Sequence, residues 1–165
     1  MCKREMGAVD QESNSTLTIV CGHCGQRLRL PERRLADAPR CARCKSPVFS
    51  LAPLALDETS FVHFTTGTEL PVLVDFWADW CGPCRSFAPI IDRAARELAP
   101  HVLVAKVDTD AAPALANRFA IRSIPTTVLL RSGLEIARHS GAVPFEGLID
   151  WVRRHGVHVG SATSR

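Results

Sequence analysis

The residues best suited to chemistry are seven cysteines, six of which form three C-x2-C pairs. The pairs are Cys21 with Cys24, Cys41 with Cys44, and Cys81 with Cys84, and Cys2 stands alone. Two intervening residues let both sulfurs of a pair reach one metal ion, or each other. Secreted disulfide frameworks use more varied spacings, so the pattern indicates metal binding and thiol redox chemistry in a reducing compartment.

The first two pairs have the spacing of a structural zinc site. Sixteen residues separate the two pairs, which is within the range for four-cysteine zinc sites. Four thiolates would complete a tetrahedron and leave no position open for a substrate. We therefore predict a structural Zn²⁺ ion, whose ligands would be Cys21, Cys24, Cys41 and Cys44. Two disulfides are the alternative under oxidising conditions.

The same segment carries the basic excess of the chain. Between residues 21 and 45 seven basic residues stand against two acidic ones, whereas the net charge of the whole chain is +3. Four thiolates on one zinc ion leave a formal charge of about −2, which these arginines would partly screen. Nucleic-acid binding is the alternative explanation. No Phe, Trp or Tyr lies between Cys21 and Cys44 to stack on a base, so we do not expect a nucleic-acid partner.

The third pair lies between a strand pattern and a helix pattern. Residues 71–78, PVLVDFWA, form a continuous apolar run typical of a buried strand. Apolar residues then recur at helical spacing through residue 98, with Pro89 predicted to kink the helix. Free N–H groups at a helix N-terminus stabilise a thiolate, so Cys81 is the predicted exposed nucleophile. Cys84 would be the more buried resolving thiol. A third zinc knuckle is the alternative, but no further ligands lie nearby in sequence.

Three other residues complete the predicted mechanism. Asp75 is the single acid within the apolar run, where burial should raise its pKa and fit it to exchange a proton with Cys84. Lys106, in the next predicted strand, could approach Asp75. Ile124 precedes Pro125, and a cis bond there would present the backbone of Ile124 to an extended substrate. The alternatives are a salt-bridged structural acid, a surface lysine and an ordinary trans proline.

The remaining patterns predict an α/β domain behind a small zinc ribbon. Helices are expected at 57–66, with Asp57 as N-cap, at 112–120 and from Pro144 to Gly156. Further strands are expected at 101–108, 126–130 and 134–141, and short strands at 17–20, 27–30 and 47–51. The predicted division is a disordered leader (1–16), a zinc ribbon too short for its own core (17–50), an α/β domain (51–158) and a flexible tail (159–165).

No run of apolar residues is long enough for a membrane span, and no secretory signal is evident. We therefore expect a cytoplasmic protein, and a monomer. The five histidines outside the cysteine-rich segment show no ligand spacing, and His23 is expected to face solvent.

Several motifs together resemble the thioredoxin family, over residues from about 54 to 156. They are VDFWADWCGPCRSFAPI, AKVDTD, IRSIPTT and SGAVP. The added N-terminal C-x2-C pairs resemble the zinc-containing bacterial thioredoxin 2 class. The resemblance implies the thioredoxin fold, in which helices flank a mixed central sheet. It also implies a Cys81–Cys84 redox pair, a buried acid Asp75, its partner Lys106 and a cis-proline Pro125.

The resemblance further implies a reductant of protein disulfides, itself reduced by thioredoxin reductase with electrons from NADPH and holding no organic cofactor. Trp77 would flank the site, and the substrate surface would comprise Trp80, Gly82, Pro83, Ile124, Pro125 and Gly141. Two alternatives stay open at this point. One is an oxidase or isomerase of the same fold, and the other is a zinc-binding module that senses oxidation.

Overall fold

The computed structural model describes residues 15–159. The predicted leader and tail therefore lie mostly outside the described residues, together with Cys2. At their described ends both predictions need correction. Thr16 is already the first residue of strand β1 (Thr16–Val20), and Val159 packs half-buried against the core. Within residues 15–159, no helix has the length and apolar character needed to span a membrane.

The α/β part is built on one five-stranded mixed sheet. Its strand order is β3 (Leu54–Ala55), β5 (Leu103–Asp108), β4 (Val72–Trp77), β6 (Thr126–Arg131) and β7 (Leu134–Ser140). The first three strands are parallel, β6 runs antiparallel to β4, and β7 runs antiparallel to β6. Since β4 and β5 are parallel neighbours, the loops that follow them leave the sheet at the same edge.

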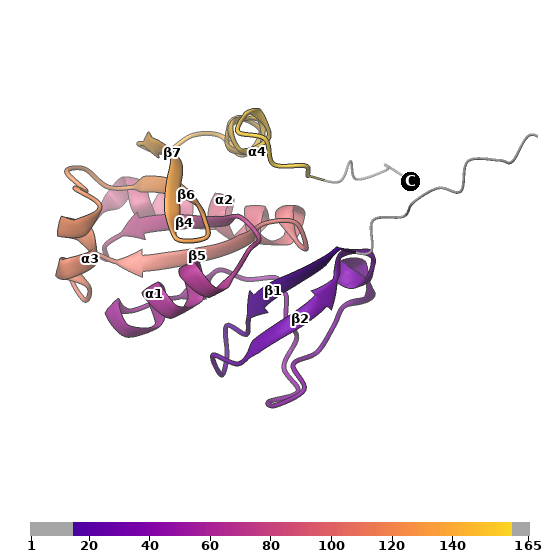
Figure 1. Ribbon diagram of the computed structural model, residues 1–165. Helices are drawn as coiled ribbons and strands as arrows, with labels where there is room; N and C mark the ends of the chain where they lie inside the picture. Colours follow the sequence, from indigo (N-terminus) through magenta and orange to yellow (C-terminus); the bar gives the residue numbers. More distant parts are fainter. Residues whose placement is uncertain (1–14, 160–165) are drawn as a thin grey trace, which may run out of the picture.

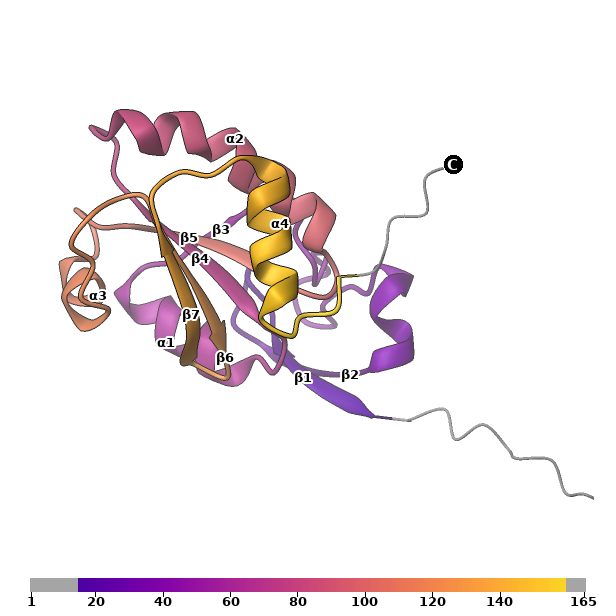
Figure 2. The same ribbon diagram turned by 90° about the horizontal axis from the view of Figure 1, so that it is seen from above.

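Two helices cover each face of the sheet (Figures 1 and 2). Helices α1 (Glu58–Gly67) and α3 (Pro113–Arg118) pack on one face, with Phe61 and Phe119 in edge-to-face contact. Helices α2 (Gly82–Leu98) and α4 (Phe145–Arg154) pack on the other. Along β4 the side chains alternate between these faces, and Asp75 points to the α2 face with Leu73. The predicted thioredoxin fold is confirmed.

Local sequence signals explain where the elements begin and end. Asp57 caps α1, because its carboxylate accepts the N–H groups of Thr59 and Ser60 at 3.0 and 2.7 Å. Ser132 and Gly133 both have positive φ, as a tight turn between β6 and β7 requires. Helix α2 continues through Pro89 without a break in its assigned structure.

The N-terminal ribbon consists of β1 paired antiparallel with β2 (Arg27–Pro31), followed by the 3₁₀ helix η1 (Glu32–Asp37). The strand predicted at 47–51 is wrong, since this segment forms only one bridge, between Pro47 and Arg40. The prediction of a segment without a core is incomplete as well. Its buried apolar residues join the core beneath α1: Ile19, Val20, Leu35, Val48 and Phe49.

The ribbon is fastened to the α/β part along the edge of β1 (Figure 1). The N–H of Glu69 donates to the carbonyl of Thr18 at 2.9 Å, and the N–H of Val20 donates to the Thr68 hydroxyl at 3.1 Å in a buried position. The side chain of Glu69 also accepts the N–H of Thr18. These bonds pair the polar groups at the exposed edge of β1. Because the side chains of Ile19 and Val20 also belong to the core of the sheet, the ribbon and the sheet share one packed interior.

Candidate functional site

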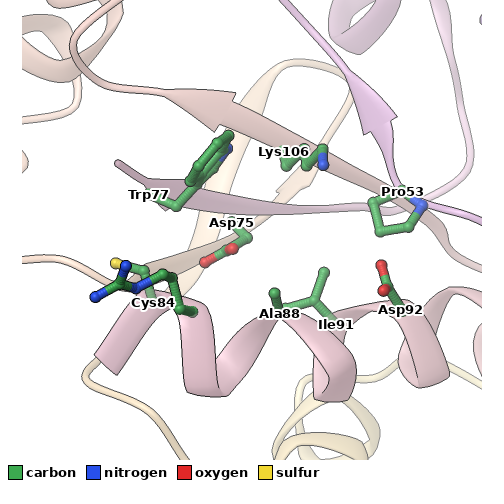
Figure 3. Close-up of a pocket in the computed structure, with 9 residues that line it drawn as sticks. Pro53, Asp75, Trp77, Cys84, Ala88, Ile91, Asp92 and Lys106 are labelled. Atoms are coloured by element: carbon green, nitrogen blue, oxygen red, sulfur yellow. The ribbon is translucent and has the colours of Figure 1, made fainter. Parts of the chain in front are cut away.

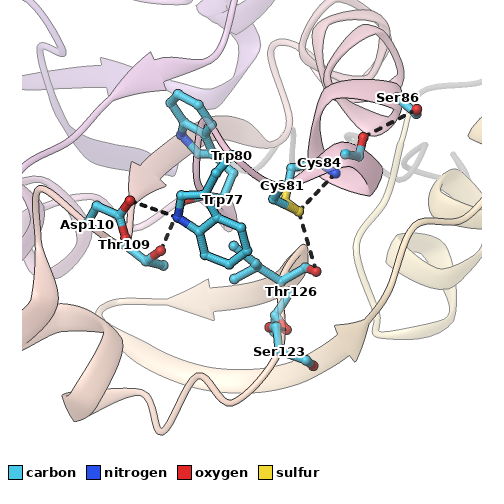
Figure 4. The surroundings of a disulfide bond; sticks show 11 residues. Trp77, Trp80, Cys81, Cys84, Ser86, Thr109, Asp110, Ser123 and Thr126 are labelled. Carbon is cyan, nitrogen blue, oxygen red and sulfur yellow. Dashed lines mark hydrogen bonds between the residues drawn. A yellow bond between two sulfur atoms is a disulfide. The ribbon is translucent and has the colours of Figure 1, made fainter.

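Cys81 and Cys84 form a disulfide at the start of α2 (Figure 4). Cys81 is the N-cap residue, and its sulfur accepts the backbone N–H of Cys84 at 3.2 Å. A sulfur held by helix N–H groups is stabilised as a thiolate once the disulfide is reduced. The sequence predicted this arrangement from the strand and helix patterns on either side of the pair.

The expected exposure of Cys81 is wrong. Cys81 is 4% exposed, and Cys84 is 2% exposed. The sulfur of Cys81 lies 3.7 Å from the carbonyl oxygen of Ile124, which a loop distant in sequence brings over the pair. Gly82 and Pro83 are exposed between the two cysteines. A substrate sulfur must therefore approach Cys81 across the Gly82–Pro83 turn and the backbone of Ile124.

Asp75 lies behind the pair, in the middle of β4. Its residue is 4% exposed, and within residues 15–159 its Oδ1 atom has no hydrogen-bond partner. Burial raises the pKa of Asp75 to about 7, although the charge of Lys106 acts in the opposite direction. Lys106 is directly opposite Asp75 in the β4–β5 register, and its Nζ atom lies 5.4 Å from the centre of the Trp77 ring.

A cavity of about 90 Å³ joins Asp75 to Cys84. Lys106, Trp77, Arg85 and Asp92 line it as well, and Figure 3 shows Asp75 pointing into the space between β4 and α2. One water needs roughly 10–15 Å³ of such volume, so several can enter. The cavity therefore provides a route by which a proton can move between the carboxyl group and the buried thiol.

A groove of about 380 Å³ lies on the other side of the pair, lined in part by Trp80 and Ile124. Trp80 is 68% exposed, and its indole N–H donates to Asp110 at 2.9 Å. The Ile124–Pro125 bond is cis, and the carbonyl of Pro125 accepts the N–H of Gly141 at 2.8 Å. Gly141 has φ of 95°, and the space beside it is open. The structure thus brings together the residues expected to form a substrate surface.

This region also contains residues that no sequence pattern predicted, among them Thr109, Asp110, Ile121 and Arg122. Thr109 and Asp110 directly follow β5, and Thr109 donates backbone and hydroxyl hydrogen bonds to the carbonyl of Trp77. The position of Thr109 and Asp110 could have been predicted from the sequence, because the ends of neighbouring parallel strands meet at one edge of a sheet. Ile121 and Arg122 lie in the loop before Ile124, and their place depends on how that loop folds back.

The four remaining described cysteines form a second centre. Their sulfur atoms all lie within 4.8 Å of one another, and the Cys21–Cys44 and Cys24–Cys41 pairs are both 3.7 Å apart. A tetrahedral ion with Zn–S bonds of about 2.3 Å would place its sulfurs about 3.8 Å apart. The cluster therefore fits zinc. Without a metal the four thiols hold their protons unequally. Hydrogen bonds from the Ser46 hydroxyl and amide lower the pKa of Cys44 to about 6, whereas burial and the neighbouring thiols raise the pKa of Cys24 to about 12, so metal binding must displace protons from the cluster.

Each zinc-binding pair is held in a tight turn of the same kind. The N–H of Gly25 donates to the carbonyl of Cys21, and that of Lys45 donates to the carbonyl of Cys41, both at 2.9 Å. Gly25 and Lys45 have φ of 71° and 62°. Gly22 allows the first knuckle to approach the α/β part closely, because a Cβ atom there would lie 2.5 Å from the side chain of Leu54.

Comparison with known proteins assigns both parts of the chain. Residues 52–154 match the family model of thioredoxin, and residues 20–46 match the family model described as thioredoxin 2, N-terminal. Thioredoxin C-3 of Corynebacterium nephridii is 43% identical over 136 residues, which cover 82% of this chain and 93% of that protein. Thioredoxin 1 of Synechococcus elongatus is 41% identical over 101 residues, 61% of this chain and 94% of that protein.

Thioredoxin of Haemophilus influenzae is 36% identical over 102 residues, which cover 62% of this chain and 95% of that protein. The matches to the α/β part include the Cys81–Cys84 pair, and the match to the ribbon includes all four clustered cysteines. The chain therefore belongs to the thioredoxin family, as a thiol–disulfide oxidoreductase with the active-site pair Cys81–Cys84 and an N-terminal four-cysteine zinc site.

Proposed function

We propose that the protein reduces disulfides of protein substrates bound along the groove beside Cys81, with Asp75 transferring the proton of Cys84. Trp80, Gly82, Pro83, Ile124, Pro125 and Gly141 would form the substrate surface. The single observation that carries the proposal is the buried Asp75 carboxyl group, without a partner in the described chain, on the same cavity as Cys84.

The reaction transfers two electrons in two exchanges. The Cys81 thiolate attacks one sulfur of the substrate disulfide, a mixed disulfide forms, and the other substrate sulfur leaves as a thiolate that takes a proton from solvent. The Cys84 thiol then gives its proton to the Asp75 carboxylate, and the new thiolate attacks the sulfur of Cys81. The second substrate thiolate leaves, the Cys81–Cys84 disulfide forms, and the substrate is fully reduced.

A pKa of about 7 suits Asp75 to this role, because the carboxyl group can both accept and release a proton near neutral pH. Lys106 would act by limiting the rise of that pKa. Zinc, when bound, would hold the ribbon and supply no chemistry to the exchange, since four thiolates leave no open position on the ion.

We further propose that thioredoxin reductase returns the oxidised pair to the dithiol with electrons from NADPH, that the protein holds no organic cofactor, and that it works as a monomer in the cytoplasm. The family assignment supports these points. The four clustered cysteines support them as well, because cysteines can bind zinc only while they are reduced, as they are in the cytoplasm. NADPH oxidation in the presence of thioredoxin reductase and a disulfide protein such as insulin tests the electron route directly.

The role of Asp75 is tested by separating the two exchanges in time. Reduced protein is mixed with an aromatic disulfide whose thiolate is coloured, so that attack by Cys81 and resolution by Cys84 give two phases. In Asp75→Asn we expect the second phase to slow about 100-fold at pH 7, while the first changes less than about twofold. Asp92→Asn, at an exposed carboxylate on the same cavity, is the control. An unchanged second phase in Asp75→Asn would remove Asp75 from the mechanism.

A further inference from the structure

A second, larger cleft lies where the ribbon meets the end of α2, and the mechanism does not use it. Its volume is about 660 Å³. Leu35 and Pro39 of the ribbon and Phe49 after the second knuckle form one wall, and Pro100 after α2 contributes to the other. None of the residues that line it belongs to the active-site cavity or to the groove beside Cys81.

The walls of this cleft are almost entirely apolar. Leu51, on its edge, is 62% exposed and is one of five large apolar side chains that the described residues leave open to solvent. A cleft of this size with apolar walls has the dimensions of a ligand or peptide site. Of the five, Leu51 is the one that lines this cleft, so the exposed apolar surface there consists of Leu51 and the apolar walls.

The charges at the cleft are of one sign. Among its described lining residues none is acidic, and Arg96 is the one with a permanent charge. Arg96 is exposed, and no ion pair or hydrogen bond is found for its guanidinium within residues 15–159. The ribbon has a formal net charge of +5 between residues 21 and 45, and about +3 when its four cysteines bind zinc as thiolates. An occupant with an apolar body and a carboxylate therefore complements this cleft.

We propose that the cleft binds an apolar peptide segment of a partner protein that carries an acidic residue next to its apolar side chains, the carboxylate pairing with Arg96. A peptide is favoured as occupant because the protein is a protein-disulfide reductase, whose substrates are themselves polypeptides. The cleft would give such a partner a second point of attachment away from Cys81. Attachment at two points raises the effective concentration of a substrate at the active site.

The arrangement also assigns a task to the zinc ribbon. The ribbon supplies Leu35 and Pro39, and Phe49 lies five residues after Cys44 of the second knuckle, so most of one wall depends on the folded zinc site. A thioredoxin domain without a ribbon would retain only the wall formed by the end of α2. The ribbon would therefore select partners, while the Cys81–Cys84 pair performs the exchange.

Three ten-residue peptides with the same apolar centre and no cysteine test the proposal, flanked by glutamate, glutamine or lysine. Their binding to the zinc-loaded full chain is measured by fluorescence polarisation. We expect the glutamate peptide to bind about tenfold more tightly than the lysine peptide. Arg96→Glu should abolish this preference, and Leu51→Asp should weaken the binding of the glutamate peptide. Arg131→Glu, the same change at an exposed arginine outside the cleft, should have little effect.

Four results would overturn the proposal. These are equal binding of all three peptides, equal losses in Arg96→Glu and Arg131→Glu, loss of binding in Cys81→Ser, or binding of decanoate in place of the peptides. The third result would assign the peptides to the groove beside Cys81, and the fourth would make the occupant a small amphipathic anion. Reduction of the small aromatic disulfide does not involve the cleft, so the slow second phase of Asp75→Asn and the lost peptide preference of Arg96→Glu are separate results. A failure of this proposal is therefore distinguishable from a failure of the proposed mechanism.

Discussion

The active-site pair and the two zinc knuckles share the same backbone turn over both cysteines. Their backbones diverge at the residue that follows the second cysteine. In all three the fifth residue donates its N–H to the carbonyl of the first cysteine: Gly25 to Cys21, Lys45 to Cys41 and Arg85 to Cys81. After that bond Arg85 continues a helix of seventeen residues, whereas Gly25 and Lys45 take positive φ and turn the chain back. The backbone after the second cysteine, and not the C-x2-C spacing, separates a redox pair from a metal knuckle.

The surroundings reinforce that separation. The two knuckles lie against each other, so that their four sulfur atoms form one cluster. Within residues 15–159 the Cys81–Cys84 pair has no comparable metal ligands beside it. Instead the pair meets a backbone carbonyl on one side and a cavity with a buried carboxyl group on the other. One ion can therefore balance the charge of four thiolates in the zinc centre, whereas the Cys81–Cys84 pair faces a buried carboxyl group that, in the mechanism we propose, takes up the proton of Cys84.

The largest effects should come from replacing by serine one cysteine of the active-site pair or one cysteine of a zinc knuckle. Cys84→Ser should leave less than about one thousandth of the insulin reductase activity, because no thiol remains to resolve the mixed disulfide, while zinc content stays at one ion per chain. Cys24→Ser should do the reverse, with zinc lost and reductase activity kept within about threefold. Zinc analysis and turnover measured on the same preparations decide it. Loss of activity in Cys24→Ser would show that the two centres are coupled.

Removing zinc from the unmodified chain should destabilise the whole molecule, because the ribbon and the sheet share a core. Ile19 and Val20 are fully buried beneath α1, and exposing two such side chains costs at least about 3 kcal/mol. For a chain of this length that is a fall in melting temperature of about 10 °C. Calorimetry with and without a chelator measures it. The Cys24→Ser variant is the control, since the chelator should change it no further.

An effect of similar size, with a pH signature, should come from Asp75→Asn. The pKa of Asp75 is about 7 in the folded protein and near 3.8 when the chain is unfolded, so the folded state binds the proton more tightly. The native protein should therefore lose stability as pH rises from 4 to 7, and the variant should not. The difference should reach about 4 kcal/mol at most above pH 7, measured by denaturant unfolding of the oxidised proteins. A difference independent of pH would contradict the burial of an ionising carboxyl group.

The sequence predicted well the features that local chemistry decides. The cap at Asp57 and the strand before Cys81 both follow from residue types and spacing. Predictions from the sequence failed where contacts between residues distant in sequence determine the structure. The low exposure of Cys81 depends on Ile124, and Val48 and Phe49 are buried by packing in the shared core and not by strand pairing. Helix η1 has no apolar period to reveal it, and Lys45 is not a residue type that indicates positive φ.

The smallest expected effect concerns the two knuckles, which share a conformation but differ in the residue that adopts it. Positive φ is unfavourable for a side chain by about 1 kcal/mol and is free for glycine. Gly25→Ala should therefore lower the stability of the zinc-loaded protein by about 1 kcal/mol, and Lys45→Gly should raise it by a few tenths to about 1 kcal/mol. Denaturant unfolding at saturating zinc measures both.

Lys45→Ala separates this backbone effect from the loss of the lysine side chain, whose Nζ atom donates to the carbonyl of Ala42 at 2.8 Å. The alanine variant keeps the strain and loses the bond, so it should be slightly less stable than the native protein, whereas the glycine variant should be more stable. If both variants lose stability equally, the ammonium group and not the left-handed backbone governs the second knuckle. The two knuckles would then hold the same zinc ion by different local means.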